Sequence, residues 1–150
     1  MSKQTQSNQI HIVLGLGSSG ISAARLLKSE GKNVLALENS YNEKLIAISN
    51  KLKSEGINVI LLDEKLSINN FTPWIGKIDT IIVSPGIEWE HKVLKELRSK
   101  NINIQGEVDM AWERLNHVPS VAVTGTNGKT TVTNMLNHVL KSNGLNTDMG

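Results

Sequence analysis

The sequence of 150 residues contains no cysteine. That absence excludes disulfide bonds, thiolate metal sites and cysteine nucleophiles, and it is compatible with a reducing compartment. Aromatic residues are also scarce, at 3% of the chain, and the three tryptophans are scattered. We therefore expect the tryptophans to pack against a sheet rather than to form a stacking platform for nucleic-acid bases.

Long apolar runs and an excess of one charge are missing as well. No apolar stretch approaches the roughly 20 residues of a membrane span, and the polar residues 1–9 contain no apolar core of signal-peptide length. The formal net charge is +2, with Lys and Arg scattered among Asp and Glu. We expect a cytoplasmic monomer with a flexible start over residues 1–9, and with neither a membrane nor a nucleic acid as partner.

Short apolar runs alternate with helical stripes along the chain. Runs rich in Ile and Val predict strands over residues 10–14, 33–37, 57–62, 80–83, 102–104 and 121–123. Apolar residues three or four apart predict the helices between them, with stripes at Ala23, Leu26 and Leu27, at Leu45, Ile48 and Leu52, and at Val93, Leu94 and Leu97. This alternation predicts an α/β fold whose parallel sheet is covered by helices on both faces.

The last part of the sequence predicts the start of a second domain. A helix is expected over residues 107–115, and residues 116–120 contain Pro119 and resemble a linker. After the strand at 121–123, an amphipathic helix begins near Lys129 and should stop at Gly144. One strand and one helix cannot form a sheet with its own core, so we expect the chain to be part of a longer protein.

A glycine-rich loop follows the first predicted strand. Gly15, Gly17 and Gly20 match G-x-G-x-x-G between a strand and a helix. Gly15 would make the tight turn, Gly17 would let backbone approach a phosphate, and Gly20 would allow close helix packing, with the helix amides facing the anion. Glu38 ends the next strand, near the position where dinucleotide-binding folds place a ribose-binding carboxylate. These residues alone predict NAD, unless the glycines serve only a turn and Glu38 is simply solvated.

A third loop, Ser84-Pro85-Gly86, follows the strand that ends at residue 83. In a parallel sheet it should lie on the same carboxyl edge as the other two loops, so that all three face one crevice. An ordinary turn explains these turn-forming residues equally well.

A second glycine loop lies in the sequence VAVTGTNGKTT, residues 121–131. Backbone amides over residues 125–128 can point at phosphate oxygens, Lys129 can reach terminal phosphates, and the Thr130 hydroxyl can help to hold a magnesium ion. The usual pattern G-x-x-x-x-G-K-[ST] is not met, because Val123 stands where the first glycine should be. We interpret the loop as a shortened phosphate-binding variant; the alternative is a surface turn.

The segment TGTNGKTT resembles the ATP loop of the Mur ligases and of their relative folylpolyglutamate synthase. The order GLGSSGIS, Glu38, SPGI, GEVD and GTNGKTT resembles the Mur ligases that add D-glutamate to UDP-N-acetylmuramoyl-L-alanine, over essentially residues 10–150. In that family the first domain is Rossmann-like but holds the uridine diphosphate of the substrate, which replaces the NAD interpretation. The resemblance implies a Rossmann-like domain over 10–117 and an incomplete beginning of the central P-loop ATPase domain over 118–150.

The resemblance also implies the roles of individual residues. For the substrate, the diphosphate contacts would be Gly17, Ser18, Ser19 and Gly20, the uridine side Glu38, Asn39 and Ser40, and the closing residue Gly86. For ATP, the contacts would be Gly125, Thr126, Asn127, Gly128, Lys129, Thr130 and Thr131. Lys129 would be the catalytic residue on the terminal phosphates, and Thr130 would lie near magnesium (Mg2+).

The implied reaction is one step of peptidoglycan synthesis with ATP and Mg2+ as cofactors. Phosphoryl transfer from ATP would activate the substrate carboxylate as an acyl phosphate, which the amine of D-glutamate then attacks. The family's other metal ligands and its D-glutamate site would lie beyond residue 150, so we expect this chain to bind without turnover. The alternatives are an L-alanine-adding Mur ligase, an NAD-binding oxidoreductase domain and a non-catalytic nucleotide-binding module.

Overall fold

The computed structural model describes residues 9–149. The flexible start expected over residues 1–9 therefore lies, apart from Gln9, outside the described residues. The chain divides into two compact units between Leu115 and Asn116, and each unit is described by itself.

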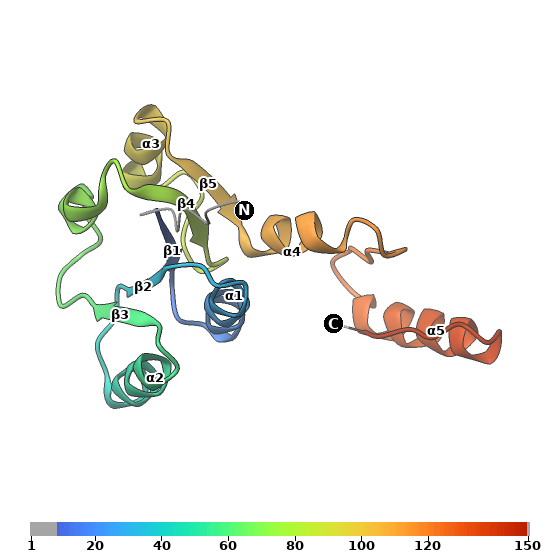
Figure 1. The fold of residues 1–150 in the computed structure, drawn as a ribbon. Coiled ribbons are helices and arrows are strands. Elements are labelled where there is room, and N and C mark those ends of the chain that lie inside the picture. The colour runs from blue at the N-terminus through green and yellow to red at the C-terminus, as the bar shows by residue number, and fades with distance from the viewer. Residues whose placement is uncertain (1–8, 150) are drawn as a thin grey trace, which may run out of the picture. The chain divides into compact units, whose positions relative to one another are not determined.

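The first unit is an α/β domain built on a parallel five-stranded sheet with the strand order β3-β2-β1-β4-β5 (Figure 1). The strands are β1 (Ile10–Leu14), β2 (Val34–Glu38), β3 (Asn58–Leu61), β4 (Ile78–Val83) and β5 (Asn103–Gly106). The five strands predicted for this region are confirmed, with ends shifted by at most two residues. Strand β1 lies at the centre, where Leu14 is level with Leu37 of β2 and with Val83 of β4.

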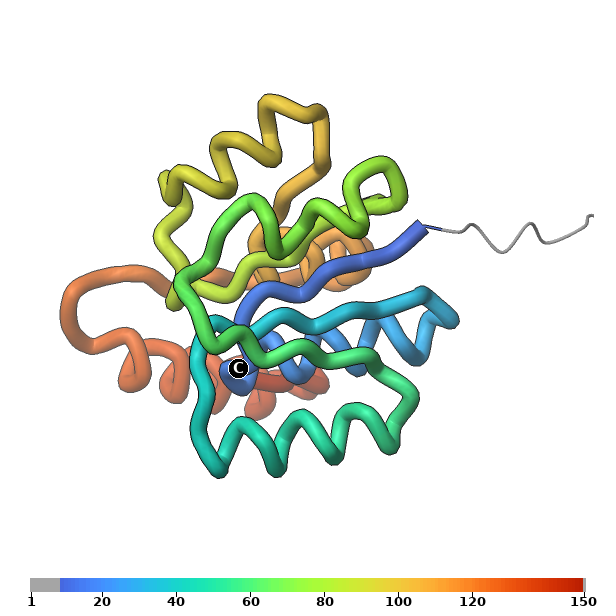
Figure 2. The backbone as a smooth tube through the Cα atoms, turned by 90° about the vertical axis from the view of Figure 1, so that its left-hand side faces the viewer, coloured from blue at the N-terminus to red at the C-terminus, as the bar shows by residue number. Residues whose placement is uncertain are grey.

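Helices cover both faces of this sheet, as predicted (Figures 1 and 2). They are α1 (Ser18–Ser29), α2 (Glu43–Ser54), α3 (Lys92–Ser99) and α4 (Glu107–Leu115), with two short 3-10 turns at Ile68–Asn70 and Thr72–Trp74. Successive strand residues point to opposite faces. Ile12 and Leu14 pack in one core with Leu94 and Leu97 of α3, and Val13 packs in the other with α1 and α2. Among the helices of residues 9–149, none has the length and apolar character that a membrane span requires.

Two details of the predicted core are wrong. Leu26 was expected in the apolar stripe of α1 but is 37% exposed, whereas Ala23 and Leu27 of the same stripe are buried in the core. Trp74 packs partly against the core, whereas Trp89 and Trp112 are 45% and 55% exposed. The Trp89 ring lies under the Arg98 guanidinium, whose central carbon is 4.3 Å from the ring centroid.

Charged contacts hold the first unit together away from the carboxyl edge of the sheet. The Arg114 guanidinium on α4 donates hydrogen bonds to both carboxylate oxygens of Glu30, just after α1, and to the carbonyl of Met110. The hydrogen bonds from Arg114 hold the pKa of Glu30 below its ordinary value. On β1, Nδ1 of His11 lies 3.4 Å from Oδ2 of Asp79, but burial lowers the pKa of this histidine more than Asp79 raises it.

The second unit contains helix α5 (Lys129–Ser142) preceded by an extended segment and a loop. The strand predicted over residues 121–123 is absent from the described residues 116–149, and Val121 is 69% exposed. An isolated strand has no neighbour to satisfy its backbone hydrogen bonds, so an apolar run alone does not make one. The predicted helix is confirmed. It ends at Ser142 with Asn143 as its C-cap, and Gly144 follows with φ +82°.

Candidate functional site

Three loops start at the same edge of the sheet in the first unit. Since Leu14 is level with both Leu37 and Val83, the residues that follow these three strand ends are neighbours. The backbone amide of Gly15 donates to the carbonyl of Leu37 over 2.8 Å, and that of Ser84 donates to the carbonyl of Leu14 over 3.0 Å. The prediction that the three loops share one carboxyl edge is confirmed. In parallel sheets, this edge at the central strands is where ligands bind.

The three glycines of the first loop serve different purposes. At Gly15, φ is +101°, and a Cβ added there would lie 2.8 Å from Cβ of Ser84. A Cβ at Gly20 would lie 2.1 Å from the carbonyl oxygen of Gly15 and 2.8 Å from Oγ of Ser84. A Cβ at Gly17 would meet nothing within 4 Å. Gly15 and Gly20 are thus required by the turn and by helix packing, whereas Gly17 leaves its backbone open to the outside.

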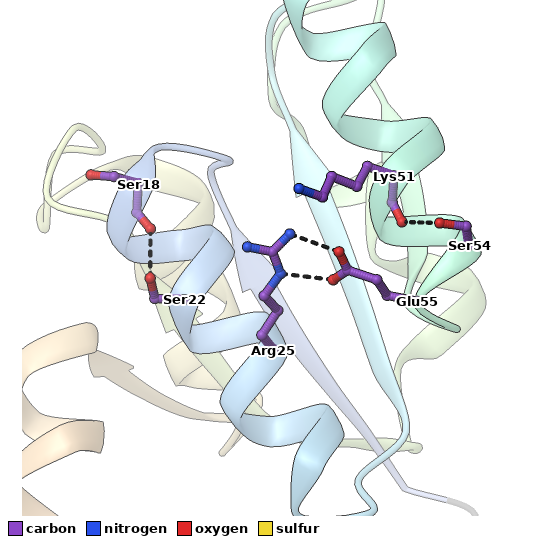
Figure 3. Close-up of polar contacts among 6 residues, drawn as sticks. All are labelled: Ser18, Ser22, Arg25, Lys51, Ser54 and Glu55. Atoms are coloured by element: carbon purple, nitrogen blue, oxygen red, sulfur yellow. Dashed lines mark hydrogen bonds and ion pairs between the residues drawn. The ribbon is translucent and has the colours of Figure 1, made fainter.

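Helix α1 begins in a way that suits a bound anion. Gly17 is its N-cap and provides no side-chain hydrogen bond to the first turn, which contains no acidic residue. Ser18 and Ser19 are exposed, while Gly20 is buried. The Ser22 hydroxyl donates to the carbonyl of Ser18, and the Ser18 hydroxyl points away from this contact (Figure 3). Uncapped amides and the positive end of the helix dipole therefore meet at an open surface.

An ion pair joins α1 to the residue that follows α2. Nε and Nη2 of Arg25 each donate to one carboxylate oxygen of Glu55 over 2.7 Å (Figure 3). The hydrogen bonds from Arg25 lower the pKa of Glu55 and outweigh the opposing effect of desolvation. The pair is exposed, so it contributes orientation between the helices more than stability.

Glu38 has a role that the sequence did not reveal. Its Oε2 accepts a hydrogen bond from the backbone amide of Leu16 over 2.7 Å, so the carboxylate supports the glycine loop. The next residues, Asn39 and Ser40, are exposed and line a hollow of about 260 Å³ together with Tyr41. The spacing of Glu38 was a sufficient signal to single it out, but only the register of β1 and β2 brings it to Leu16.

The third loop contributes a buried hydroxyl and an exposed glycine. Ser84 is 7% exposed, and its hydroxyl donates to Oε1 of Glu107, which is 8% exposed. Gly86 is exposed, with nothing within 4 Å of an added Cβ. The sequence analysis named Glu107 as the start of the helix expected over 107–115 and as part of the GEVD segment, but assigned it no role. An acidic residue at a helix start is usually solvated, so its burial could not be anticipated.

The second glycine loop lies in the second unit and is shaped by its own residues. Nζ of Lys129 donates to the carbonyl of Gly125 over 2.6 Å, which turns the side chain back over the loop. Gly128 is the N-cap of α5 with φ +77°, a conformation that favours glycine. The expected ATP contacts over residues 125–131 are all exposed, and Lys129 and Thr130 line a hollow of about 300 Å³. The loop and the uncapped start of α5 can receive an anion.

Comparisons with known proteins point to one family. A family model described as "Mur ligase MurD-like, N-terminal domain" matches residues 9–106. The chain is 78% identical over 150 residues to "UDP-N-acetylmuramoylalanine--D-glutamate ligase" of Prochlorococcus marinus (strain NATL2A), covering all of this chain and 32% of that protein. It is 45% identical over 139 residues to the protein of the same name from Synechococcus sp. (strain CC9605), covering 93% and 30%. The chain thus spans about a third of the length of these curated relatives.

Solved structures agree on the fold. The UDP-N-acetylmuramate-alanine ligase MurC of Thermotoga maritima matches with a TM-score of 0.53 and 29% identity, covering 89% of this chain and 29% of that one. The UDP-N-acetylmuramate:L-alanyl-gamma-D-glutamyl-meso-diaminopimelate ligase of Neisseria meningitides matches with a TM-score of 0.59 and 22% identity, covering 91% and 40%.

Proposed function

Because this chain belongs to the Mur ligase family, in its MurD-like branch, we propose that its first unit binds the uridine diphosphate of UDP-N-acetylmuramoyl-L-alanine. The whole protein would join D-glutamate to that substrate in peptidoglycan synthesis. The observation that carries this proposal is the 78% identity, over the whole chain, with a relative named as a D-glutamate ligase.

The geometry of the first loop supports the diphosphate site. Gly17 faces open space, so phosphate oxygens can approach the amides of residues 17–20 without meeting a side chain. The exposed hydroxyls of Ser18 and Ser19 add donors beside those amides. Donors at an uncapped helix start, with no carboxylate in the first turn, favour a charged phosphate over a neutral group.

The uridine would lie on the side of the site formed by the loop after β2. There Glu38 keeps Oε1 for the ribose while Oε2 holds the loop, and Asn39 and Ser40 line the adjoining hollow. Gly86 would close the crevice from the loop after β4, where the lack of a side chain lets backbone approach the ligand.

The second glycine loop is proposed as the ATP site of a domain that begins at residue 118, with residues 10–117 forming the substrate domain. The residues present fit MgATP: Lys129 brings its charge over the loop, and the exposed Thr130 hydroxyl can reach a cation bridging the phosphates. ATP supplies the phosphoryl group that activates the substrate carboxylate. Lys129 would neutralise charge on that group, and the loop amides of residues 125–128 would hold the nucleotide in line.

The whole reaction requires more than these residues. The relatives are about three times longer than this chain, and we infer that the D-glutamate site and the remaining metal ligands lie in that additional length. This chain should therefore bind its ligands without turnover. We further propose a cytoplasmic monomer, since the nucleotide substrates of such a ligase are intracellular.

A titration followed by NMR tests the proposed function. UDP-N-acetylmuramoyl-L-alanine should shift the amide signals near Ser18, Glu38 and Gly86, and NAD should shift none of them. UMP, which lacks the second phosphate, should shift the signals near Glu38 more than those near Ser18. Binding of NAD with no response to the uridine nucleotide would return the first unit to the dinucleotide-binding domains and overturn the proposal.

A further inference from the structure

A buried hydroxyl and a buried carboxylate lie behind the first glycine loop. Oγ of Ser84 donates to Oε1 of Glu107 over 2.5 Å and lies 3.3 Å from the carbonyl oxygen of Gly15. The second carboxylate oxygen, Oε2 of Glu107, is buried and has no hydrogen-bond partner within residues 9–149. The hydrogen bond to Ser84 is therefore the side-chain contact that compensates this carboxylate in the described part of the chain.

The same hydroxyl fills the space left by two glycines. An added Cβ would come within 2.9 Å of Oγ of Ser84 at Gly15 and within 2.8 Å at Gly20. The Ser84 side chain is thus in contact with the turn after β1 and with the first turn of α1 at once. A displacement of Ser84 would leave room on the inner side of the loop, into which residues 15–20 could move.

Burying the Glu107 carboxylate behind the loop costs free energy. Removing a charge from water is unfavourable unless it is hydrogen-bonded, although the position of Glu107 at the first residue of α4 places it at the favourable end of a helix dipole. A charged acceptor in return holds a hydroxyl in one orientation more strongly than a neutral acceptor does.

We propose that Ser84 and Glu107 are positioning residues for the diphosphate site. They act through Gly15 and Gly20, and they hold the loop at the depth where the amides of residues 17–20 meet the diphosphate. This inference rests on the proposed function of the first unit.

The test measures two properties in four variants, which are three single substitutions and one double substitution. Calorimetry measures the affinity for UDP. NMR of the free chain measures the hydrogen exchange of the amides of Gly15, Leu16 and Ile21, which are hydrogen-bonded within or beside the loop. Ser84→Ala and Glu107→Leu should each weaken UDP binding by about tenfold and speed exchange by a similar factor, as expected for losing a hydrogen bond to a charged group. Glu107→Gln keeps an acceptor oxygen of the same reach and should lose less than about threefold. The double variant Ser84→Ala/Glu107→Leu should bind UDP no more weakly than the weaker of the two single variants, because both substitutions remove the same hydrogen bond.

Matched controls separate positioning from a general loss of stability. Ser99→Ala removes an exposed hydroxyl at the end of α3, and Glu43→Gln removes an exposed charge at the first residue of α2. Neither should change the amide exchange of Gly15, Leu16 and Ile21. If Glu107→Leu shows no dispersed NMR spectrum, Ser84→Ala, which removes only a hydroxyl, decides the test.

The outcomes distinguish the two proposals. Failure of UDP to bind the unmodified chain would overturn the proposed function. UDP binding that survives Ser84→Ala, with unchanged amide exchange of Gly15, Leu16 and Ile21, would overturn the positioning role alone. Strictly additive losses in the double variant would also count against it, because independent residues do not share one contact.

Discussion

A methyl group added to the first glycine loop should have different consequences at Gly20 and at Gly17. Gly20→Ala is expected to destabilise the first unit, and Gly17→Ala is expected to leave it folded but unable to bind UDP tightly. The two substitutions are chemically identical and three residues apart. The contrast therefore tests whether the surroundings, and not the glycine motif as such, determine what each position does.

The magnitudes follow from the space at each Cβ. In an ordinary helix interior Gly→Ala would stabilise by about 0.5–1 kcal/mol. The Cβ at Gly20, however, would lie 2.1 Å from the carbonyl oxygen of Gly15, a backbone atom that cannot rotate away. Overpacking costs about 1–3 kcal/mol and more where backbone must move, so we expect a net loss of about 2 kcal/mol in the free energy of unfolding.

At Gly17 the backbone is extended, with φ −66° and ψ 176°, a conformation open to alanine. An N-cap alanine should cost less than about 1 kcal/mol. The methyl group would instead project into the space where we place the diphosphate, and a steric block there should weaken UDP binding by at least about tenfold.

Urea denaturation followed by circular dichroism measures the first effect, and calorimetric titration with UDP measures the second. The reasoning would be refuted by a Gly20→Ala chain as stable as the unmodified one. It would equally be refuted by a Gly17→Ala chain that binds UDP with unchanged affinity.

Three further predictions concern pH, an ion pair and the second loop. Burial lowers the pKa of His11 from 6.5, so the unfolded chain takes up this proton first as the pH falls. The free energy of unfolding should therefore decrease below about pH 6.5. Urea titrations should show that His11→Asn flattens this decrease and that the exposed control His138→Asn does not. Glu30→Gln should lower the free energy of unfolding by about 1 kcal/mol at pH 7. Because Arg114 lowers the pKa of Glu30, this difference from the unmodified chain should disappear as the pH falls from about 4.5 through the lowered pKa. A difference that persists at pH 2 would contradict the ion-pair explanation. Lys129→Met should weaken binding of MgATP by about tenfold or more in calorimetry and leave UDP binding unchanged; an unaltered affinity for ATP would exclude the assigned role.

Local pattern was sufficient for most of the first unit. The apolar run at β1 and the stripe of α3 depend only on neighbours along the chain. The strand was predicted at its observed limits, and the three predicted stripe residues of α3 are buried. The strand expected over residues 121–123 failed because a strand exists only when another segment pairs with it. Its sequence is apolar enough, but pairing is a property of distant residues.

The candidate site was likewise predicted only in part. The sequence by itself predicted the two glycine loops, the position of Glu38 after a strand and the family resemblance, because each depends on a short segment of consecutive residues. Only the tertiary structure decided that Ser84, 69 residues away in the chain, contacts Gly15, and that Glu107 lies behind it. Such contacts depend on strand order and register, which set neighbours across the sheet and which no local spacing encodes.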